Sequence, residues 1–346
     1  MSEYPAIMGD YRRIVVKFAL VVDCAEDIAD ESRFDHPTWS SVELIRDAVE
    51  KAGFACSIFG GIKELIHAYD SARVFDSDEV FLNFSTGLTQ KHRQIQAPVL
   101  LELLDVPYAC SEPFALALAD NKHFSKLAVR ENGLCNIPEG ILITDEAELK
   151  RISSLNNYPY LVKPNGEGGS LGIHQRNVVI NPHEALHVAR EVLMRYGEVL
   201  VEQYVAGVDL TNMVFGNHGE TTFNEVIVYK TAGSYLQQNK VRDFETKYSN
   251  DPTLQKELLQ EVSRDTGFAS KVKATTLGII DTIGTRDIAR VDYRVTESGD
   301  LFFLEINALP RIDPRDAYGV NLHKLRMTFD DYIKAFVETV VRRMNA

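Results

Sequence analysis

Four polar side chains near the end of the chain have the types and the spacing of a metal-bound phosphate site. Arg290 and Asp292 alternate with apolar residues in one strand-like run, and Glu305 and Asn307 do so in the next. Turn-forming residues 297–300 fold the second run back onto the first. Hard oxygen ligands suit Mg²⁺ or Mn²⁺ shared with phosphate, and an adjacent arginine suits a transferring phosphoryl group. The alternative is a hairpin with a solvated polar face.

The same alternation predicts how the remaining side chains of this hairpin are sorted between its two faces. In the first strand it separates the apolar Ala289, Val291 and Tyr293 from Arg290, Asp292 and Arg294. In the second strand it places Phe302, Leu304 and Ile306 opposite Phe303, Glu305 and Asn307.

A second candidate site is the loop from Lys163 to Gly172, KPNGEGGSLG, which holds four glycines and a serine. Glycine permits positive φ and close approach, so such a loop can wrap backbone N–H groups around a phosphate. The loop is not a Walker A sequence and lacks GxGxxG spacing, and a flexible hairpin turn fits it equally well. Lys163 points more strongly to a phosphate, because a charge at the end of an apolar strand needs a partner.

Composition indicates a soluble globular enzyme of two or three domains. The 346 residues are 45% apolar and 25% charged, and the net charge of −13 leaves no basic excess for nucleic acid or an anionic membrane. Four cysteines lie far apart without metal-binding spacing, which favours a reducing cytosol. No apolar run is long enough to span a membrane, so we expect a cytoplasmic protein without a membrane partner.

Strand and helix patterns predict a doubly wound α/β domain up to residue 115. Ser40 and Glu43 fit a capping box at the start of its first helix, and Gly53 is placed to end that helix. The expected strands are 13–23, 54–61, 78–85 and 107–111, and the expected helices are 40–52, 61–71 and 95–104.

A smaller α+β domain is expected over residues 116–205, and an antiparallel domain over 206–346. Two short helices broken at Asp120-Asn121 come first, and Asn181 with Glu184 caps a later helix that Gly197 ends. Central strands are expected at 139–143, 160–164, 172–179 and 198–205, with helices at 146–153 and 183–196. The last domain is expected to contain strands 209–216 and 224–229, a long loop over 232–251, a helix over 252–284, the acidic hairpin and a helix over 329–344.

Five stretches, in order and at similar spacing, make the chain resemble the ATP-grasp carboxylate–amine ligases, and among them the D-alanine–D-alanine ligase group. They are LLELLDVPYACSEPFALALADNKHFSK, YLVKPNGEGGSLGI, LVEQYVAGVDLT, DFETKYS, and ARVDYRV with FLEINALP. The resemblance implies a three-domain ATP-grasp fold, α/β and α+β in class, with ATP between the last two domains and Mg²⁺ on the final hairpin. It implies small-molecule carboxylate and amine substrates that meet through an acyl phosphate, and we expect a homodimer.

The resemblance also assigns roles by position. Asp292, Glu305 and Asn307 resemble the metal ligands, and Arg290, Lys247 and Ser170 are the candidate catalytic residues. Glu202 resembles the acceptor of the adenine amino group, Val205 the hinge residue that reads the base, and Asp209 the ribose acceptor. The full set of expected nucleotide contacts is Lys122, Lys163, Glu167, Gly168, Gly169, Ser170, Glu202, Gln203, Val205, Asp209, Lys247 and Tyr248.

The chain departs from the family where D-alanine would be recognised. Arg311 replaces a glycine whose N–H helps to form the oxyanion hole, and RIDPRD replaces a serine-containing loop. The glycine-rich GGxSxE segment and the HG loop are also missing. Arg311, Arg315 and Asp316, with Arg93, are therefore candidates for an acidic-substrate pocket.

Two alternatives to the acidic-substrate pocket stay open. The arginines could simply pair with Asp313 and Asp316. At the level of function, the alternatives are a D-alanine–D-alanine ligase proper and a nucleotide-binding protein without turnover.

Overall fold

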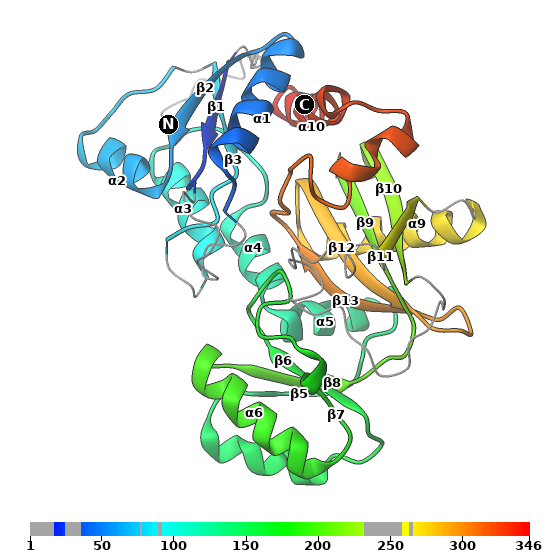
Figure 1. The fold of residues 1–346 in the computed structure, drawn as a ribbon. Helices are drawn as coiled ribbons and strands as arrows, with labels where there is room; N and C mark the ends of the chain where they lie inside the picture. The colour runs from blue at the N-terminus through cyan, green and yellow to red at the C-terminus, as the bar shows by residue number, and fades with distance from the viewer. Residues whose placement is uncertain (1–16, 25–35, 77, 89–91, 232–257, 263–265) are drawn as a thin grey trace, which may run out of the picture.

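Three β-sheets organise the chain (Figure 1). The computed structural model describes residues 17–24, 36–76, 78–88, 92–231, 258–262 and 266–346. The predicted α/β and α+β parts are both present in chain order, and the antiparallel carboxy-terminal sheet carries the acidic hairpin. The domain boundaries at residues 115 and 205 stay a prediction. None of the helices within the described ranges has the length and apolar character needed to cross a bilayer.

The amino-terminal sheet is parallel, with its strands in the order β2-β1-β3-β4. Helix α1 packs on one face and helices α2 and α3 on the other, so the central strands are apolar on both sides. The strands are β1 (Lys17–Val21), β2 (Ala55–Gly60), β3 (Glu79–Asn83) and β4 (Tyr108–Ala109), and the helices are α1 (Trp39–Lys51), α2 (Ile62–Asp70) and α3 (Gln96–Leu103).

The start of α1 differs from the prediction. Thr38 is the N-cap residue, because its backbone is extended and its hydroxyl accepts a hydrogen bond from the Ser41 amide at 3.3 Å. Ser40 already lies inside the first turn, where its hydroxyl bonds to Thr38 Oγ1 at 3.0 Å. The capping box predicted at Ser40 is therefore wrong. Gly53 has φ +98° just beyond the helix, in line with its predicted role.

The central sheet is antiparallel, with the order β5-β8-β6-β7, and helix α6 packs against it. The predicted cap of α6 is present, since Asn181 accepts from the Glu184 amide at 3.0 Å and Gly197 ends the helix at φ +78°. The elements are β5 (Gly140–Ile143), β6 (Tyr160–Pro164), β7 (Val178–Val179), β8 (Val199–Gln203) and α6 (Pro182–Tyr196).

One prediction for this domain is confirmed in a modified form and one is wrong. The helix predicted over 146–153 is present, as the 3₁₀ helix η3 (Glu146–Ser154). The strand predicted over 172–179 shrinks to β7, because Gly172 turns the chain at φ +71° and the 3₁₀ turn η4 (Gln175–Asn177) follows. The Asn177 side chain fixes that turn by donating to Val162 O at 2.6 Å.

The carboxy-terminal sheet has the order β11-β10-β9-β12-β13, with every pair antiparallel. Its strands are β9 (Val208–Asn217), β10 (Glu220–Thr231), β11 (Leu258–Val262), β12 (Asp287–Val295) and β13 (Leu301–Asn307). The single helix predicted over 252–284 is wrong: β11 occupies part of that stretch, and helix α9 (Thr266–Ile283) begins only afterwards. Pairing with β10, a long-range contact, overrides the local helical pattern.

Helices cover this sheet unequally. The predicted short helices α4 (Pro113–Asp120) and α5 (Lys122–Glu131) pack against β13, and α9 packs beside α5. On the opposite face, α10 (Phe329–Met344) and Tyr318, the residue before the 3₁₀ helix η5 (Gly319–Leu325), contact Phe215 and Phe223 through aromatic rings. The part of that second face around Asp209, Asp292 and Glu305 lines a pocket.

Because β13 contains a bulge, its side chains are distributed between the two faces differently from the prediction. The register pairs Asp292 with Glu305 but Tyr293 with Phe303, so Leu304 is the extra residue. Phe303 therefore lies on the core face and is fully buried, whereas it was predicted to share a face with Glu305. Beyond the bulge the pairing of Arg290 with Asn307 keeps the four polar residues on one face, as predicted.

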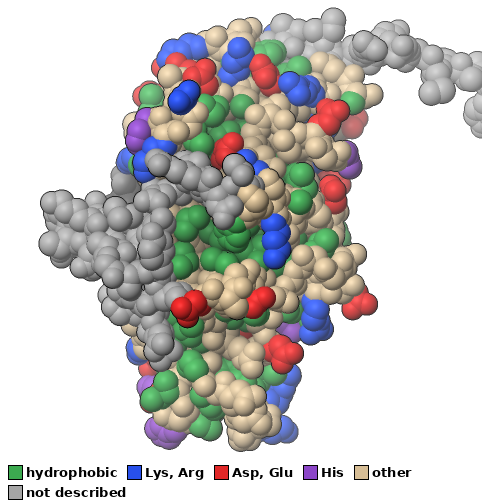
Figure 2. All heavy atoms as spheres, turned by 90° about the vertical axis from the view of Figure 1, so that its right-hand side faces the viewer, with side chains coloured by type: hydrophobic (Ala, Val, Ile, Leu, Met, Phe, Trp, Pro, Cys, Tyr) green, Lys and Arg blue, Asp and Glu red, His purple; other side chains and the backbone are tan. Residues whose placement is uncertain are grey.

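The amino-terminal and carboxy-terminal sheets share one continuous core, whereas the central sheet has its own. Helix α10 packs against α1, and Arg343 on α10 donates to both oxygens of the fully buried Asp287 at 2.7 Å. Arg343 also donates to Tyr108 O at 3.0 Å, which ties β12 to β4. On the face shown in Figure 2, Lys and Arg side chains are intermixed with Asp and Glu, and no basic stripe is visible.

Candidate functional site

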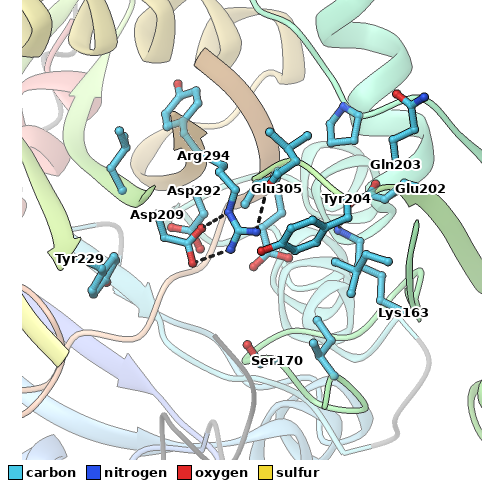
Figure 3. A pocket seen from close by; sticks show the side chains of 17 residues that line it. Lys163, Ser170, Glu202, Gln203, Tyr204, Asp209, Tyr229, Asp292, Arg294 and Glu305 are labelled. Carbon is cyan, nitrogen blue, oxygen red and sulfur yellow. Dashed lines mark hydrogen bonds and ion pairs between the residues drawn. The ribbon is translucent and has the colours of Figure 1, made fainter. Parts of the chain in front are cut away.

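A pocket of about 750 Å³ lies between the central sheet and the uncovered part of the carboxy-terminal sheet (Figure 3). Strands β6 and β8 supply one wall, strands β9, β10, β12 and β13 supply the other, and Ser170 comes from the glycine loop. The predicted nucleotide residues among its lining are Lys163, Ser170, Glu202, Gln203, Val205 and Asp209, together with the predicted metal ligands Asp292 and Glu305.

The acidic hairpin brings its predicted residues together. Arg290 donates to both oxygens of Asp292 at 3.0 Å, and Asn307 Nδ2 lies 3.4 Å from Asp292 Oδ2. Burial opposes the charge on Arg290, but the Asp292 carboxylate outweighs it and raises the pKa of the guanidinium. Thr211 on β9 also donates to Asp292, at 2.6 Å. Sequence analysis missed Thr211, because its pairing with Asp292 across the sheet leaves no local signal.

These residues fit a divalent cation. Asp292 and Glu305 are direct cross-strand partners. Asn307, opposite Arg290, adds an amide on the same face of the hairpin, so hard oxygen donors gather at one point. Among the residues that the structure describes, no cluster has three or more His, Cys, Asp or Glu side chains, as expected for a set of two carboxylates and an amide. Phosphate oxygens would complete the coordination of such a site.

A buried charge cluster lies deeper in the pocket. Lys163 Nζ pairs with Glu202 Oε1 at 2.6 Å, and Lys126 Nζ lies 3.5 Å from Oε2. Burial raises the pKa of Glu202, but Lys126 and Lys163 outweigh it, and the net shift is downward. Oε2 is buried and accepts no hydrogen bond within the described part of the chain. A buried carboxylate oxygen that accepts no hydrogen bond suits the predicted contact of Glu202 with an adenine amino group.

Lys126 was missed by sequence analysis. Its ammonium group also donates to Leu304 O at the bulge and lies 5.6 Å from the centre of the Phe303 ring. Burial lowers its pKa to about 7, although Glu202 opposes the shift. The available signal was its position one helical turn after Lys122, which puts both lysines on the same face of α5.

The glycine loop lies beside the acidic hairpin. Lys122 Nζ is 3.3 Å from Glu305 Oε2 and donates to Glu167 O, so it links the loop to the hairpin. The loop bends through Gly169 at φ +62° and the non-glycine Ser170 at φ +66°. Positive φ at two successive residues makes a tight bend, which suits a loop that wraps around a phosphate.

On the nucleoside side, Arg294 binds the predicted ribose acceptor. Its Nε and Nη2 donate to Asp209 at 2.6 and 3.0 Å, and its Nη1 donates to Val205 O at 3.1 Å (Figure 3). Burial opposes its charge, but Asp209 outweighs that and raises the pKa of the guanidinium. Sequence analysis placed Arg294 on the polar face of β12 but gave it no role.

The residues predicted to bind substrate form a separate cluster, here called the acceptor loop (residues 311–316). Arg311 and Arg315 both donate to the buried Asp313, at 2.7 and 2.8 Å, as in the alternative weighed above. Ser41 on α1 donates to the same carboxylate at 2.5 Å. Burial raises the pKa of Asp313, but these donors outweigh it and hold that pKa well below its usual range.

Other predicted residues are placed differently. Asp316 accepts from the backbone amides of Tyr318 and Gly319 at 2.8 and 2.7 Å, and burial raises its pKa to about 6. Arg93 begins the short 3₁₀ helix η2 (Arg93–Ile95), and its positive charge acts on Asp120. Lys247 and Tyr248 lie outside the described residues.

The pocket lies between the central α+β domain and the antiparallel sheet. The glycine loop, two lysines, a buried glutamate and the acidic hairpin lie at it, which is the arrangement expected of the ATP-grasp class of ligases. A model of the D-Ala D-Ala ligase carboxy-terminal domain matches residues 137–338, more than half of the chain. The protein therefore belongs to the D-alanine–D-alanine ligase family, whose members are ATP-dependent ligases that form a C–N bond.

Individual relatives agree with this assignment. The chain is 31% identical over 211 residues to the D-alanine–D-alanine ligase of Aquifex aeolicus, a match covering 61% of this chain and 66% of that one. The crystal structure of the Bacillus anthracis D-alanine–D-alanine ligase complexed with ATP superposes with a TM-score of 0.68 at 18% identity, over 95% of this chain and 98% of that one. The VanG D-Ala:D-Ser ligase of Enterococcus faecalis also gives 0.68 at 18% identity, over 94% and 99%.

Proposed function

We propose that this protein uses Mg²⁺–ATP to form an amide bond between a small carboxylic acid or amino acid and an amine, a pair other than D-alanine with D-alanine. The observation that carries the proposal is a contrast at the end of the hairpin. Asp292, Glu305 and Asn307 converge as a nucleotide-bound metal requires, whereas Arg311 and Arg315 pair with Asp313 on the segment where the resemblance leads us to expect the D-alanine contacts. Mn²⁺ would fit the same oxygen ligands.

Charge neutralisation is the main work of the pocket residues. A substrate carboxylate attacks the γ-phosphate of ATP, ADP leaves, and an acyl phosphate forms; the amine then attacks the acyl carbon and phosphate leaves. Lys122, Lys163 and the glycine-loop amides would offset the negative charge that builds up as two anions meet. Mg²⁺, when bound, would neutralise charge on the phosphate oxygens.

Arg290 would steady the transferred phosphate, because Asp292 holds its guanidinium on the pocket face of β12. Ser170 and Lys247 are the further candidate catalytic residues, with Tyr248 beside Lys247. Water must be kept from the acyl phosphate, and a pocket enclosed by two sheets and a glycine loop favours that exclusion.

The acceptor loop is the proposed source of substrate selection. Two arginines share the one buried carboxylate of Asp313, and Arg311 Nε is buried without a hydrogen-bond partner in the described part of the chain. An acidic substrate fits such a site through guanidinium geometry. Asp316 would contribute indirectly, by holding the loop's backbone.

Release of ADP and phosphate tests the proposal. Purified protein is incubated with Mg²⁺–ATP and pools of carboxylic acids and amino acids, and products are identified by mass spectrometry. Release that requires a particular acid–amine pair supports the proposal, and loss of that release in Arg311→Ala supports the acidic pocket. Release with D-alanine alone would identify a D-alanine–D-alanine ligase proper, and tight ATP binding without release in any pool would contradict turnover.

The expected homodimer is part of the same proposal. The relatives' names say nothing of assembly, so the expectation is tested directly by light scattering of the purified protein. A mass of one chain across the working concentration range would contradict it.

A further inference from the structure

Arg294 is a buried cation on the nucleoside side of the pocket, at a position that the family resemblance gave no role. Its side chain is 7% exposed and extends from β12 toward Asp209 and Tyr204 (Figure 3). Two nitrogens of one planar group donate to the two oxygens of Asp209, at 2.6 and 3.0 Å. A fork of this kind fixes the plane of the carboxylate as well as its distance, which a single point charge cannot do.

The third nitrogen of the same guanidinium reaches the hinge. Nη1 donates to Val205 O at 3.1 Å, so Arg294 contacts both the connector between β8 and β9, at Val205, and the start of β9, at Asp209. Between those two residues, the backbone at Gly207 runs directly against β12, where a Cβ would lie 2.2 Å from Val295 O. The segment 205–209 is therefore fixed to β12 at three successive places.

Stability alone does not explain this arrangement. Burying a guanidinium and a carboxylate costs desolvation, and an apolar pair of similar volume commonly holds two strands as well or better. Arg294 also lies over the Tyr204 ring, 5.3 Å from its centre, and shares the polar face of β12 with Arg290 and Asp292. A charged fork at this place fixes orientation, which a binding site needs more than a core does.

We propose that Arg294 is a positioning residue for the nucleoside: it orients Asp209 toward the ribose hydroxyls and Val205 toward the base. The proposal rests on the proposed function, in which those two residues bind the nucleoside. It adds a residue that contacts neither phosphate nor metal, and it predicts that ribose recognition depends on a side chain from β12.

Nucleotide binding by the full-length protein, measured by calorimetry, tests this without requiring turnover. Dissociation constants are compared for ATP and 2′,3′-dideoxyATP in the wild type, Arg294→Met, Arg294→Lys and Asp209→Asn. Because hydrogen bonds to a charged group are at stake, we expect the wild type to prefer ATP by roughly ten- to a hundredfold. In Arg294→Met that preference should fall to about twofold or less, with most of the change in ATP binding.

Arg294→Lys keeps the charge without the fork, so it should recover less than half of the lost preference on a logarithmic scale. Arg294→Met added to Asp209→Asn should have little further effect, since both changes remove one contact. The control is Arg190→Met, which removes an exposed ion pair with Glu146 on the central domain and should change neither constant.

The outcomes separate the two proposals. Equal weakening of both nucleotides in Arg294→Met, with an unchanged ratio, would overturn the positioning role and leave a structural one. An unchanged melting temperature in Arg294→Lys guards against misfolding as the cause. If the wild type binds ATP with the expected ribose preference but turns over no substrate, the ligase proposal is contradicted and the positioning role of Arg294 stands. A wild type that binds no ATP would overturn both proposals.

Discussion

The pocket and the acceptor loop both concentrate arginines, lysines and carboxylates, but they use them differently. At the pocket, opposite charges come from different elements, since Lys163 on β6 pairs with Glu202 on β8 and Lys122 on α5 pairs with Glu305 on β13. In the acceptor loop, the charges lie within five residues of one another and converge on Asp313. The pocket pairs join separate elements, whereas the loop pairs join residues of one short segment to a single carboxylate.

This difference follows the boundary that the sequence drew between positions that resemble the family's and positions that depart from it. The four polar residues of the hairpin lie on strands, where sheet register fixes their position to within the pleat. The divergent residues lie on a loop that needs its own support, and Asp313, Ser41 and Thr38 supply it by tying the loop to the start of α1. A change of substrate in this fold would therefore involve helix α1 as well as the loop.

The largest effect is expected from Glu305→Gln in the pocket. The change keeps the side chain's shape but removes a charge opposite Asp292, so the metal and the transferring phosphate lose support. We expect kcat to fall about 10³-fold, measured as ADP release with the substrate pair that the screen identifies. Glu297→Gln, in the exposed turn of the same hairpin, is the control, and a loss of less than tenfold in Glu305→Gln would contradict the metal assignment.

The next effect, on stability, is expected from Asp313→Asn in the acceptor loop. It leaves Arg311 and Arg315 without their buried partner, and we expect a loss of about 3 kcal/mol in the free energy of unfolding. Chemical denaturation measures it. Asp330→Asn, which breaks an exposed pair with Lys51, should cost less than about 0.5 kcal/mol.

The same variant has a defined pH dependence. The folded pKa of Asp313 is lower than its usual value of 3.8, so its contribution to stability is present above about pH 4 and is lost as the pH falls below it. The stability gap between the wild type and Asp313→Asn should therefore be constant from pH 7 to 5 and shrink toward pH 3. A gap that does not change with pH would show that Asp313 acts through shape alone.

A smaller effect is expected from Lys126→Met, which tests how far the pocket's charge network extends. The change removes a donor to Leu304 O and one of the two cations near Glu202, so the adenine acceptor and the bulge both lose support. We expect KM for ATP to rise about tenfold with kcat changed less than threefold, since the loss is in ground-state binding. Lys150→Met, on the exposed side of the central domain, is the matched control.

The sequence predicted the polar face of the hairpin better than the residues and strands that surround it. Period-two alternation placed Arg290, Asp292, Glu305 and Asn307 on one face, and it failed at Phe303 because a bulge is set by long-range contacts. The strand β11 was predicted as helix for a similar reason, since its pairing with β10 has no local signature. Thr211 and Lys126 reach the site from other elements, and only their positions in space reveal them.

The smallest effect is expected at the start of α1, where the acceptor loop meets its support. Thr38 accepts from the Ser41 amide at 3.3 Å, and Arg315 Nη2 lies 3.5 Å from the same hydroxyl, so one side chain both caps the helix and touches the loop. Thr38→Ala should lower the free energy of unfolding by about 1 kcal/mol. Ser40→Ala, two residues on and inside the first turn, should change it by less than half as much. Equal losses of stability in the two variants would contradict the assignment of Thr38 as the N-cap. A Thr38→Ala variant with normal stability but altered substrate preference would show that the loop, rather than the helix, depends on this hydroxyl.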